Sequence, residues 1–249
     1  MDRIFIFDVD GTLTPSRLPM TKEFQKFFKQ WIKKNKFYLV TGSDLPKLQE
    51  QMCMYDIEAE GIFTCCGNQF WLPNPSVPIQ SADLIYSNKF KPPKDLIEYL
   101  ERKVLKSEYP NRCGNHIEDR GSMVNFSVVG RNCTQEQRED YFKWDKKMGE
   151  RNITCMEIKG TWPTLDAVVG GQISVDIYPK GMDKSQIIEH IEDIEEKYCP
   201  DKYIFIGDRT MEGGNDYPLA KLMTGKSFRD FYQTEGPEQT QKILESLID

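Results

Sequence analysis

A short stretch near the start of the chain, residues 4–14, constrains the fold more than any other part of the sequence. Its residues are Ile-Phe-Ile-Phe-Asp-Val-Asp-Gly-Thr-Leu-Thr, so four consecutive apolar residues lead directly into two acids separated by one residue. An apolar run without alternation is typical of a parallel strand that is buried on both faces. Because alternate side chains of an extended chain point the same way, Asp8 and Asp10 are expected to face one pocket.

The pair Asp8 and Asp10 indicates a functional site at the end of this strand. Two carboxylates in one pocket are costly to bury unless a cation or a reaction uses them. A polar strand end followed by a turn would explain Asp-x-Asp alone, which occurs often by chance. The complete run with Gly-Thr-Leu-Thr after it is far rarer, so we interpret the pair as a site.

Strands and helices alternate in the first part of the chain and again near its end. Thr21 can cap the first helix, whose apolar residues recur at i, i+3, i+4 and i+7 up to Trp31. This rhythm predicts a parallel sheet with right-handed crossovers. The elements are expected at residues 21–31 (helix), 37–40 (strand), 45–52 (helix), 61–63 (strand), 183–194 (helix), 203–206 (strand) and 238–247 (helix).

The middle of the chain has a different pattern. Several prolines within residues 72–93 suit a hinge or linker. After them we expect a helix at residues 95–105, strands at 116–119, 123–129 and 172–178, and a helix that begins with a Thr-x-x-Gln capping box at residue 134. We therefore predict an α/β fold. Its Rossmann-like parallel sheet core comprises residues 1–82 and 183–249, and an α+β domain is inserted at residues 83–182.

Charge and cysteine content exclude several partners and sites. The chain has 39 acidic and 33 basic residues, a net charge of −6, so we expect no nucleic acid and no membrane as a partner. No apolar run approaches the roughly 20 residues of a membrane span, and the early strand leaves no room for a signal peptide. The seven cysteines form no Cys-x-x-Cys pair and no cluster with histidine at zinc spacing. We expect reduced thiols and a cytoplasmic location.

Three of the expected strands end in polar residues, at Asp8 and Asp10, at residues 41–44, and at Asp208. In a doubly wound sheet such strand ends line one crevice, where ligands bind. The loop after Asp208 adds two glycines and Asp216. A pocket rich in carboxylates with almost no histidine suits Mg²⁺, although Asp208 alone could simply cap a helix.

These residues suggest phosphoryl transfer. A carboxylate such as Asp8, beside Mg²⁺ and a phosphate, can attack phosphorus and form an aspartyl-phosphate, while the cation offsets the repulsion between anions. Asp10 can protonate the leaving oxygen and later activate the incoming one. Lys184, at the start of the helix that returns to the sheet, can neutralise charge at Asp8. A lysine at such a position is more often a solvated surface residue, and this alternative stays open.

The motifs together resemble those of the haloacid-dehalogenase (HAD) superfamily of phosphotransferases. Asp-x-Asp-Gly-Thr-Leu-Thr, a hydroxyl residue after the second strand (Ser43), a lysine (Lys184) and Gly-Asp at Asp208 occur in the expected order. The resemblance implies a HAD-type core with an inserted cap domain.

The inserted segment carries three arginines, Arg120, Arg131 and Arg138, whose charge is permanent. Arg131 and Arg138 flank the N-terminus of the capped helix, a favourable place for a phosphate. Ser174 and Asp176 share one face of a strand and suit sugar hydroxyls. From the residues alone, a set of surface arginines on an insertion stays an alternative explanation.

The strings around these residues resemble the eukaryotic-type α-phosphomannomutases, a HAD family with an inserted α/β cap. They are Ile-Glu-Asp-Arg-Gly-Ser-Met-Val-Asn from residue 117, Val-Gly-Arg-Asn-Cys-Thr-Gln-Glu-Gln-Arg from residue 129 and Gly-Gly-Gln-Ile-Ser-Val-Asp from residue 170. The resemblance extends from residue 5 to about residue 216. It implies an enzyme that interconverts mannose 6-phosphate and mannose 1-phosphate, is primed by a hexose 1,6-bisphosphate, and dimerises through its cap domains.

The resemblance also implies residue roles. Asp8 would be the nucleophile, Asp10 the acid/base and Lys184 the catalytic lysine. Asp8, Asp208 and the backbone carbonyl of Asp10 would hold Mg²⁺. The residues that would contact the hexose phosphate are Arg17, Ser43, Arg120, Met123, Asn125, Arg131, Arg138, Ser174 and Asp176.

Two segments depart from the family's pattern. Cys65-Cys66-Gly67 stands where the family usually has Glu-Asn-Gly, and the loop after Asp216 lacks the acidic segment that the family uses near a second cation. Two alternatives to a mutase are left open by the sequence. One is a HAD-type hexose-phosphate phosphatase on the same scaffold, and the other is a non-catalytic protein that binds phosphosugars.

Overall fold

The computed structural model describes residues 2–52, 59–74, 82–196 and 200–247, which divide into two compact units. The first unit comprises Met1–Ser87, Asp183–Glu212 and Asp216–Asp249, and the second comprises Asn88–Met182 and Gly213–Asn215. The domain boundaries predicted at residues 82/83 and 182/183 stay a prediction. In the structure, residues 83–87 form a strand of the first unit's sheet and therefore group with that unit.

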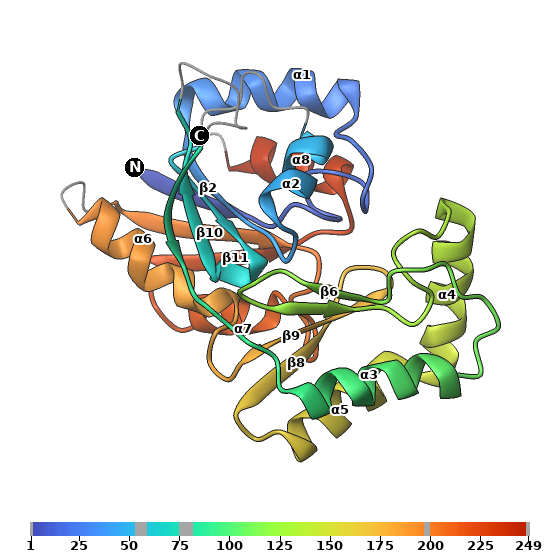
Figure 1. Ribbon diagram of the computed structural model, residues 1–249. Coiled ribbons are helices and arrows are strands. Elements are labelled where there is room, and N and C mark those ends of the chain that lie inside the picture. The colour runs from blue at the N-terminus through green and yellow to red at the C-terminus, as the bar shows by residue number, and fades with distance from the viewer. Residues whose placement is uncertain (1, 53–58, 75–81, 197–199, 248–249) are drawn as a thin grey trace. The chain divides into compact units, whose positions relative to one another are not determined.

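A seven-stranded sheet forms the centre of the first unit (Figure 1), with the order β11-β10-β1-β2-β3-β4-β5. The strands from β11 to β3 are parallel, whereas β4 and β5 pair antiparallel. The central position of β1 explains why its apolar run does not alternate, since helices cover both of its faces. The strands are β1 (Arg3–Phe7), β2 (Lys36–Val40), β3 (Gly61–Thr64), β4 (Gln69–Leu72), β5 (Asp83–Ser87), β10 (Lys202–Gly207) and β11 (Arg229–Gln233).

The two faces of this sheet carry separate apolar clusters. Phe5 and Phe7 of β1 pack on one face against the aromatic residues of α1, including Phe28 and Trp31. Ile4 and Ile6 belong to the cluster on the other face, with the isoleucines of α6. In Figure 1, α1, α2 and α8 lie on one side of the sheet and α6 and α7 on the other. These helices are α1 (Lys22–Trp31), α2 (Leu45–Met52), α6 (Ile187–Glu195), α7 (Tyr217–Met223) and α8 (Pro237–Ser246).

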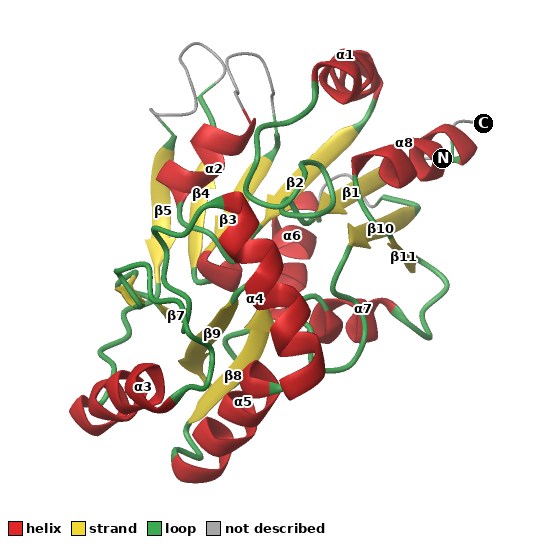
Figure 2. Cartoon of the chain, turned by 90° about the vertical axis from the view of Figure 1, so that its right-hand side faces the viewer, coloured by secondary structure: helices red, strands yellow, loops and turns green. Residues whose placement is uncertain are grey.

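The second unit is built on a four-stranded antiparallel sheet with the order β6-β7-β9-β8. Alternate apolar residues of these strands pack in one cluster with side chains of α3, α4 and α5, which lie on one face of the sheet (Figure 2). This is the α+β arrangement that the sequence predicts. The elements are α3 (Lys94–Lys106), β6 (Ile117–Asp119), β7 (Val124–Phe126), α4 (Gln135–Met148), α5 (Glu150–Thr161), β8 (Leu165–Gly170) and β9 (Ser174–Pro179).

Most elements expected from the sequence are confirmed, with small shifts at their ends. Thr21, Thr134 and Asp183 each accept a hydrogen bond from a backbone amide at a helix start, and both hydrogen bonds of the capping box at Thr134 are present. No sequence pattern predicted α5, whose apolar spacing is interrupted by polar residues, or the strands β4, β8 and β11. Residues 217–223, expected as part of a loop after Asp216, form α7. β5 lies in the segment that its prolines predict to be a linker, of which residues 75–81 lie outside the described residues. Within the described ranges, no helix combines the length and the apolar character that crossing a membrane requires.

Candidate active site

The candidate site of the first unit is centred on Lys184, a fully buried lysine between two buried carboxylates. Its Nζ lies 2.5 Å from Oδ1 of Asp8 and 2.6 Å from Oδ1 of Asp216. Asp8 follows β1, and Asp216 immediately precedes α7. Asp183 caps the short 3₁₀ helix (Lys184–Gln186) that leads into α6 and so places the lysine at the sheet. Lys184 is therefore not a solvated surface residue.

Asp208 joins this group from the neighbouring strand. Because β1 and β10 are parallel and Phe7 pairs with Ile206, Asp8 and Asp208 both emerge at the carboxyl ends of adjacent strands. Gly11 permits this close approach, since a Cβ there would lie 2.6 Å from Oδ2 of Asp208, and its φ of 84° is one that glycine tolerates best.

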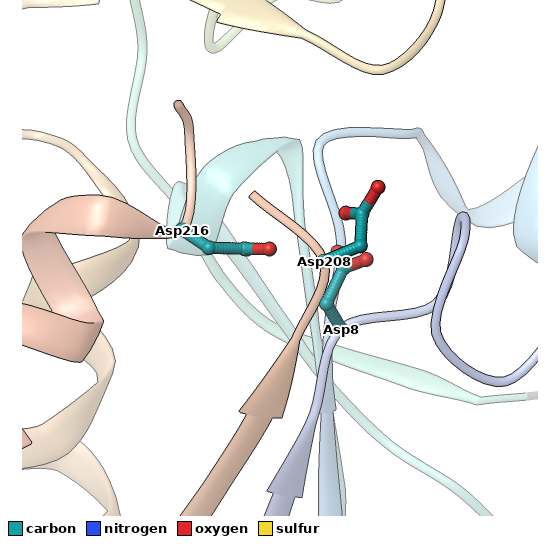
Figure 3. A group of neighbouring side chains, drawn as sticks. All are labelled: Asp8, Asp208 and Asp216. Atoms are coloured by element: carbon teal, nitrogen blue, oxygen red, sulfur yellow. The ribbon is translucent and has the colours of Figure 1, made fainter. Parts of the chain in front are cut away.

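Three carboxylates of this site converge, as Figure 3 shows for Asp8, Asp208 and Asp216. One oxygen from each lies within 4.8 Å of the others. Burial, followed by the charge of Asp216, raises the pKa of Asp8 well above its usual range and that of Asp208 to about 7. Burial disfavours the charge of Lys184, but Asp216 and Asp8 raise its pKa well above the usual range.

The donor set of this cluster fits a hard divalent cation. Three carboxylates and one ammonium leave a formal charge of −2 on the group of Asp8, Asp208, Asp216 and Lys184. Carboxylate oxygens are the ligands that Mg²⁺ prefers, and Mg²⁺ needs only one or two of them together with waters or phosphate oxygens. The sequence predicts Asp208 as a ligand and Asp216 as a further acid, but no local pattern indicates that Asp216 pairs with Lys184.

The side chain of Asp10 lies outside this carboxylate group and is held by three hydrogen-bond donors. Oδ1 accepts hydrogen bonds from the backbone N–H of Arg17 at 2.6 Å and from Nε2 of Gln51 at 2.8 Å, and Oδ2 accepts one from the Ser43 hydroxyl at 3.4 Å. Arg17 adopts a φ of 61°, which places its N–H at the carboxylate. The three residues thus fix the carboxylate that is predicted to transfer protons.

Gln51 is a residue of this site that the sequence analysis missed. Its side chain is buried, and Nε2 also lies 3.3 Å from Oγ1 of Thr14. It belongs to α2, where its only sequence signal was a polar residue next to Met52, at the end of an amphipathic helix. Neither spacing nor composition connects Gln51 with Asp10, which precedes it by 41 residues.

In the second unit, two of the predicted arginines share one carboxylate. Glu118 Oε2 lies 2.8 Å from Nη2 of Arg120 and 3.1 Å from Nε of Arg131. Both arginine side chains are about 6% exposed. Two guanidinium groups around one carboxylate give this trio a formal charge of +1, which favours an anion nearby.

The remaining predicted residues of the second unit form two further groups. Arg138 is buried at the first turn of α4 and its Nε lies 3.3 Å from Oε1 of Gln172. Asn125 and Asp176 are opposite each other on β7 and β9, and Nδ2 of Asn125 donates to Oδ1 of Asp176 at 2.6 Å. Ser174 is also on β9, where its hydroxyl donates to the carbonyl of Gly170, and Met123 precedes β7 and is fully buried.

The predicted residues therefore fall into sets within each unit. Asp8, Lys184 and Asp208 lie together in the first unit, with Asp10, Ser43 and Arg17 joined by hydrogen bonds beside them. Their roles in binding and catalysis stay predictions.

The chain is similar to known phosphomannomutases over most of its length. The family model described as eukaryotic phosphomannomutase matches residues 24–249. A phosphomannomutase from Encephalitozoon cuniculi is 37% identical over 222 residues, which cover 87% of this chain and 83% of that protein. A phosphomannomutase from Spinacia oleracea is 36% identical over 220 residues, covering 87% of this chain and 85% of that protein.

Among solved structures, a haloacid dehalogenase-like hydrolase from Bacteroides thetaiotaomicron superposes with a TM-score of 0.55 over 100% of both chains. Its sequence identity of 13% limits the likeness to the fold. The Rossmann-like parallel sheet core predicted from the sequence is thereby confirmed.

Proposed function

Because this chain belongs to the eukaryotic phosphomannomutase family, we propose that it is an enzyme that interconverts mannose 6-phosphate and mannose 1-phosphate. The family resemblance inferred from the sequence is confirmed by these matches. The family model begins at residue 24, after Asp8 and Asp10. The roles of these two aspartates are therefore supported by the geometry around them.

The buried contact between Lys184 and Asp8 is the observation that carries the proposal. A nucleophilic carboxylate must be ionised, yet burial raises the pKa of Asp8, and Lys184 opposes this rise. Asp8, Asp208 and the carbonyl of Asp10 would hold Mg²⁺, with Asp216 close by. When bound, the cation would supply positive charge that favours the ionised carboxylate and screens the phosphoryl oxygens.

In the proposed reaction, a carboxylate oxygen of Asp8 attacks the phosphorus of a hexose bisphosphate. A P–O bond forms at Asp8 as the P–O bond to the sugar breaks, and Asp10 donates a proton to the departing sugar oxygen. In the return step, a hexose monophosphate that carries its phosphate at the other position binds, and Asp10 takes the proton from its free hydroxyl while that oxygen attacks the aspartyl-phosphate and re-forms the bisphosphate. Asp8 is then regenerated, and each transfer conserves the proton and the phosphoryl group.

The second unit would bind the phosphate that is not being transferred. The positively charged trio of Arg120, Arg131 and Glu118 and the buried Arg138 at the first turn of α4 support this assignment. Because either end of the sugar can react, a site for the distal phosphate must accept both isomers. The pair Asn125 and Asp176, with Ser174 and Met123, and Arg17 of the first unit would contact the sugar phosphate.

The wider setting belongs to the same proposal. We expect Mg²⁺ as the cation, a hexose 1,6-bisphosphate as the primer that first phosphorylates Asp8, a homodimer formed through the second units, and a cytoplasmic location. These expectations follow from the resemblance described in the sequence analysis, and the three converging carboxylates also support the cation.

A coupled assay tests the proposal. Mannose 1-phosphate is supplied with Mg²⁺ and a catalytic amount of hexose 1,6-bisphosphate, and both mannose 6-phosphate and free phosphate are measured. We expect the isomer to accumulate without an equivalent release of phosphate. Release of free phosphate without isomer would instead identify a hexose-phosphate phosphatase, the alternative that the sequence leaves open.

A further inference from the structure

Cys113 and Cys133 lie on two backbone segments of the second unit that are hydrogen-bonded to each other, and Cys133 lies just before α4. The N–H of Cys113 donates to the carbonyl of Val129 at 2.8 Å, and the carbonyl of Cys113 accepts from the N–H of Asn132 at 3.1 Å. The N–H of Arg131 donates to the carbonyl of Gly114. Since Cys133 directly follows Asn132, the backbone pairing places the two cysteines next to each other.

Both thiols lie beside the first turn of α4, where Cys113 contacts Gln137 and Cys133 contacts Arg138. The Cys113 thiol lies 3.3 Å from Oε1 of Gln137, and the same oxygen accepts the N–H of Thr134 at 2.8 Å. That N–H belongs to the peptide bond formed by Cys133. Burial and then the proximity of Cys133 raise the pKa of Cys113. Both side chains are half-exposed, and neither is part of a disulfide.

We propose that Cys113 and Cys133 are a modification site at which a peroxide forms a reversible disulfide. Two S–H bonds break and one S–S bond forms, so the thiols lose two electrons and two protons. These reduce the O–O bond of hydrogen peroxide to two molecules of water. A small-molecule dithiol reverses the reaction by thiol–disulfide exchange.

The disulfide acts on the predicted phosphate-binding arginines, a consequence that rests on the proposed function. In the reduced protein, Sγ of Cys133 lies 3.9 Å from Nη1 of Arg138, and the Cys113 thiol donates to Gln137. The disulfide removes the thiol donor of Cys113 and draws the Cys133 sulfur away from Arg138 toward Cys113. We expect the KM for hexose phosphates to rise about fivefold, the factor that corresponds to the loss of one ordinary hydrogen bond, with little change in kcat.

The test uses the full chain treated with hydrogen peroxide and then mapped by mass spectrometry without reduction. A peptide pair that joins Cys113 to Cys133, 2 Da lighter than the two thiol peptides, is expected, and a dithiol should remove it. Cys133→Ser should abolish this pair. Cys155→Ala is the matched control and should retain it, because Cys155 is buried in α5 and is not one of the two thiols of the pair.

Two thiols that stay reduced, or a Cys113 linked to another cysteine, would overturn the proposal. An intact disulfide with an unchanged KM would overturn its effect on phosphate binding. The mass measurement does not depend on turnover, so a reduced protein that fails to isomerise hexose phosphates would disprove the proposed function and leave the disulfide standing.

Discussion

The two units of this protein bury charge in opposite senses. In the first unit, Asp8, Asp208 and Asp216 surround one lysine and leave a formal charge of −2. In the second unit, Arg120 and Arg131 share the single carboxylate of Glu118, which leaves that trio at +1. The first group suits a divalent cation, and the second suits an anion.

This difference indicates which chemistry belongs to which unit. A carboxylate that is to attack phosphorus must lie where a cation can approach it, as Asp8 does in the acidic group. Guanidinium groups in the second unit offer no nucleophile, but their planar forks match phosphate oxygens. A phosphatase needs only the first kind of site, whereas a mutase needs both.

The largest predicted effect concerns Asp8, the predicted nucleophile of the first unit. Asp8→Asn keeps the shape of the side chain but removes the nucleophile, so phosphoenzyme formation from hexose 1,6-bisphosphate should vanish and turnover should fall by about 10⁴-fold or more. Radiolabelled phosphate on the intact protein is the measurement. Asp176→Asn is the matched variant in the second unit. It should weaken sugar binding yet still allow the protein to be labelled, and a labelled Asp8→Asn protein would contradict the mechanism.

A second prediction separates the units by substrate. Arg131→Ala removes one guanidinium from the trio around Glu118, so kcat/KM for mannose 1-phosphate should fall about 100-fold, as expected for the loss of a charge-assisted contact. Hydrolysis of p-nitrophenyl phosphate, which has no second phosphate, should change little.

The control for this variant is Arg102→Ala, on the exposed surface of α3 in the same unit. It should leave both activities unchanged. Equal losses on the two substrates for Arg131→Ala would show that Arg131 does not bind the distal phosphate.

The sequence predicted more of the site in the first unit than in the second, and the reason is physical. The strand at residues 4–7 and the acids after it are contiguous, so one stretch contains both the fold signal and the chemistry. Lys184 could be placed only by its position before a helix, because its partner Asp8 precedes it by 176 residues. The exposed fraction of that lysine depends on tertiary packing, which no local pattern encodes.

In the second unit, the local sequence predicted less of the site. Its arginines stood out through resemblance, but their partner Glu118 is two residues from Arg120 and was not identified as one. Helix α5 was missed because polar residues obscure its period, and the six-residue strand β8 was missed as well. Gly170, at the end of β8, is needed because a Cβ there would lie 2.3 Å from Oδ2 of Asp176.

A third prediction tests the excess negative charge directly. In the metal-free protein the pKa of Asp208 is about 7, against an ordinary value of 3.8, with burial and Asp216 as the main causes. Because the pKa of Asp208 is higher in the folded than in the unfolded protein, its contribution to stability is fully present below the unfolded pKa, near pH 4. This contribution is lost as the pH rises through the folded pKa of about 7.

Denaturant unfolding of the metal-free wild type and Asp208→Asn measures this effect. Between pH 5.5 and pH 8 the difference in the free energy of unfolding should move in favour of the variant by about 2 kcal/mol. Added Mg²⁺ should reduce the difference at pH 8 by stabilising the wild type. No movement with pH would mean that the acidic group carries no excess charge.

The smallest predicted effect concerns Gln51, whose side chain donates to Asp10 and belongs neither to the carboxylate group around Lys184 nor to the trio around Glu118. Its amide donates to Oδ1 of Asp10 at 2.8 Å from a buried position on α2. Gln51→Leu keeps the apolar packing but frees the carboxylate, so kcat should fall about tenfold, equivalent to about 1.4 kcal/mol. The KM for hexose phosphates should stay nearly constant, because the proposed site for the distal phosphate is in the second unit. Gln51→Glu, which places a second carboxylate beside Asp10, should lower kcat further. A Gln51→Leu variant that loses stability while keeping its kcat would show that Gln51 only packs the helix.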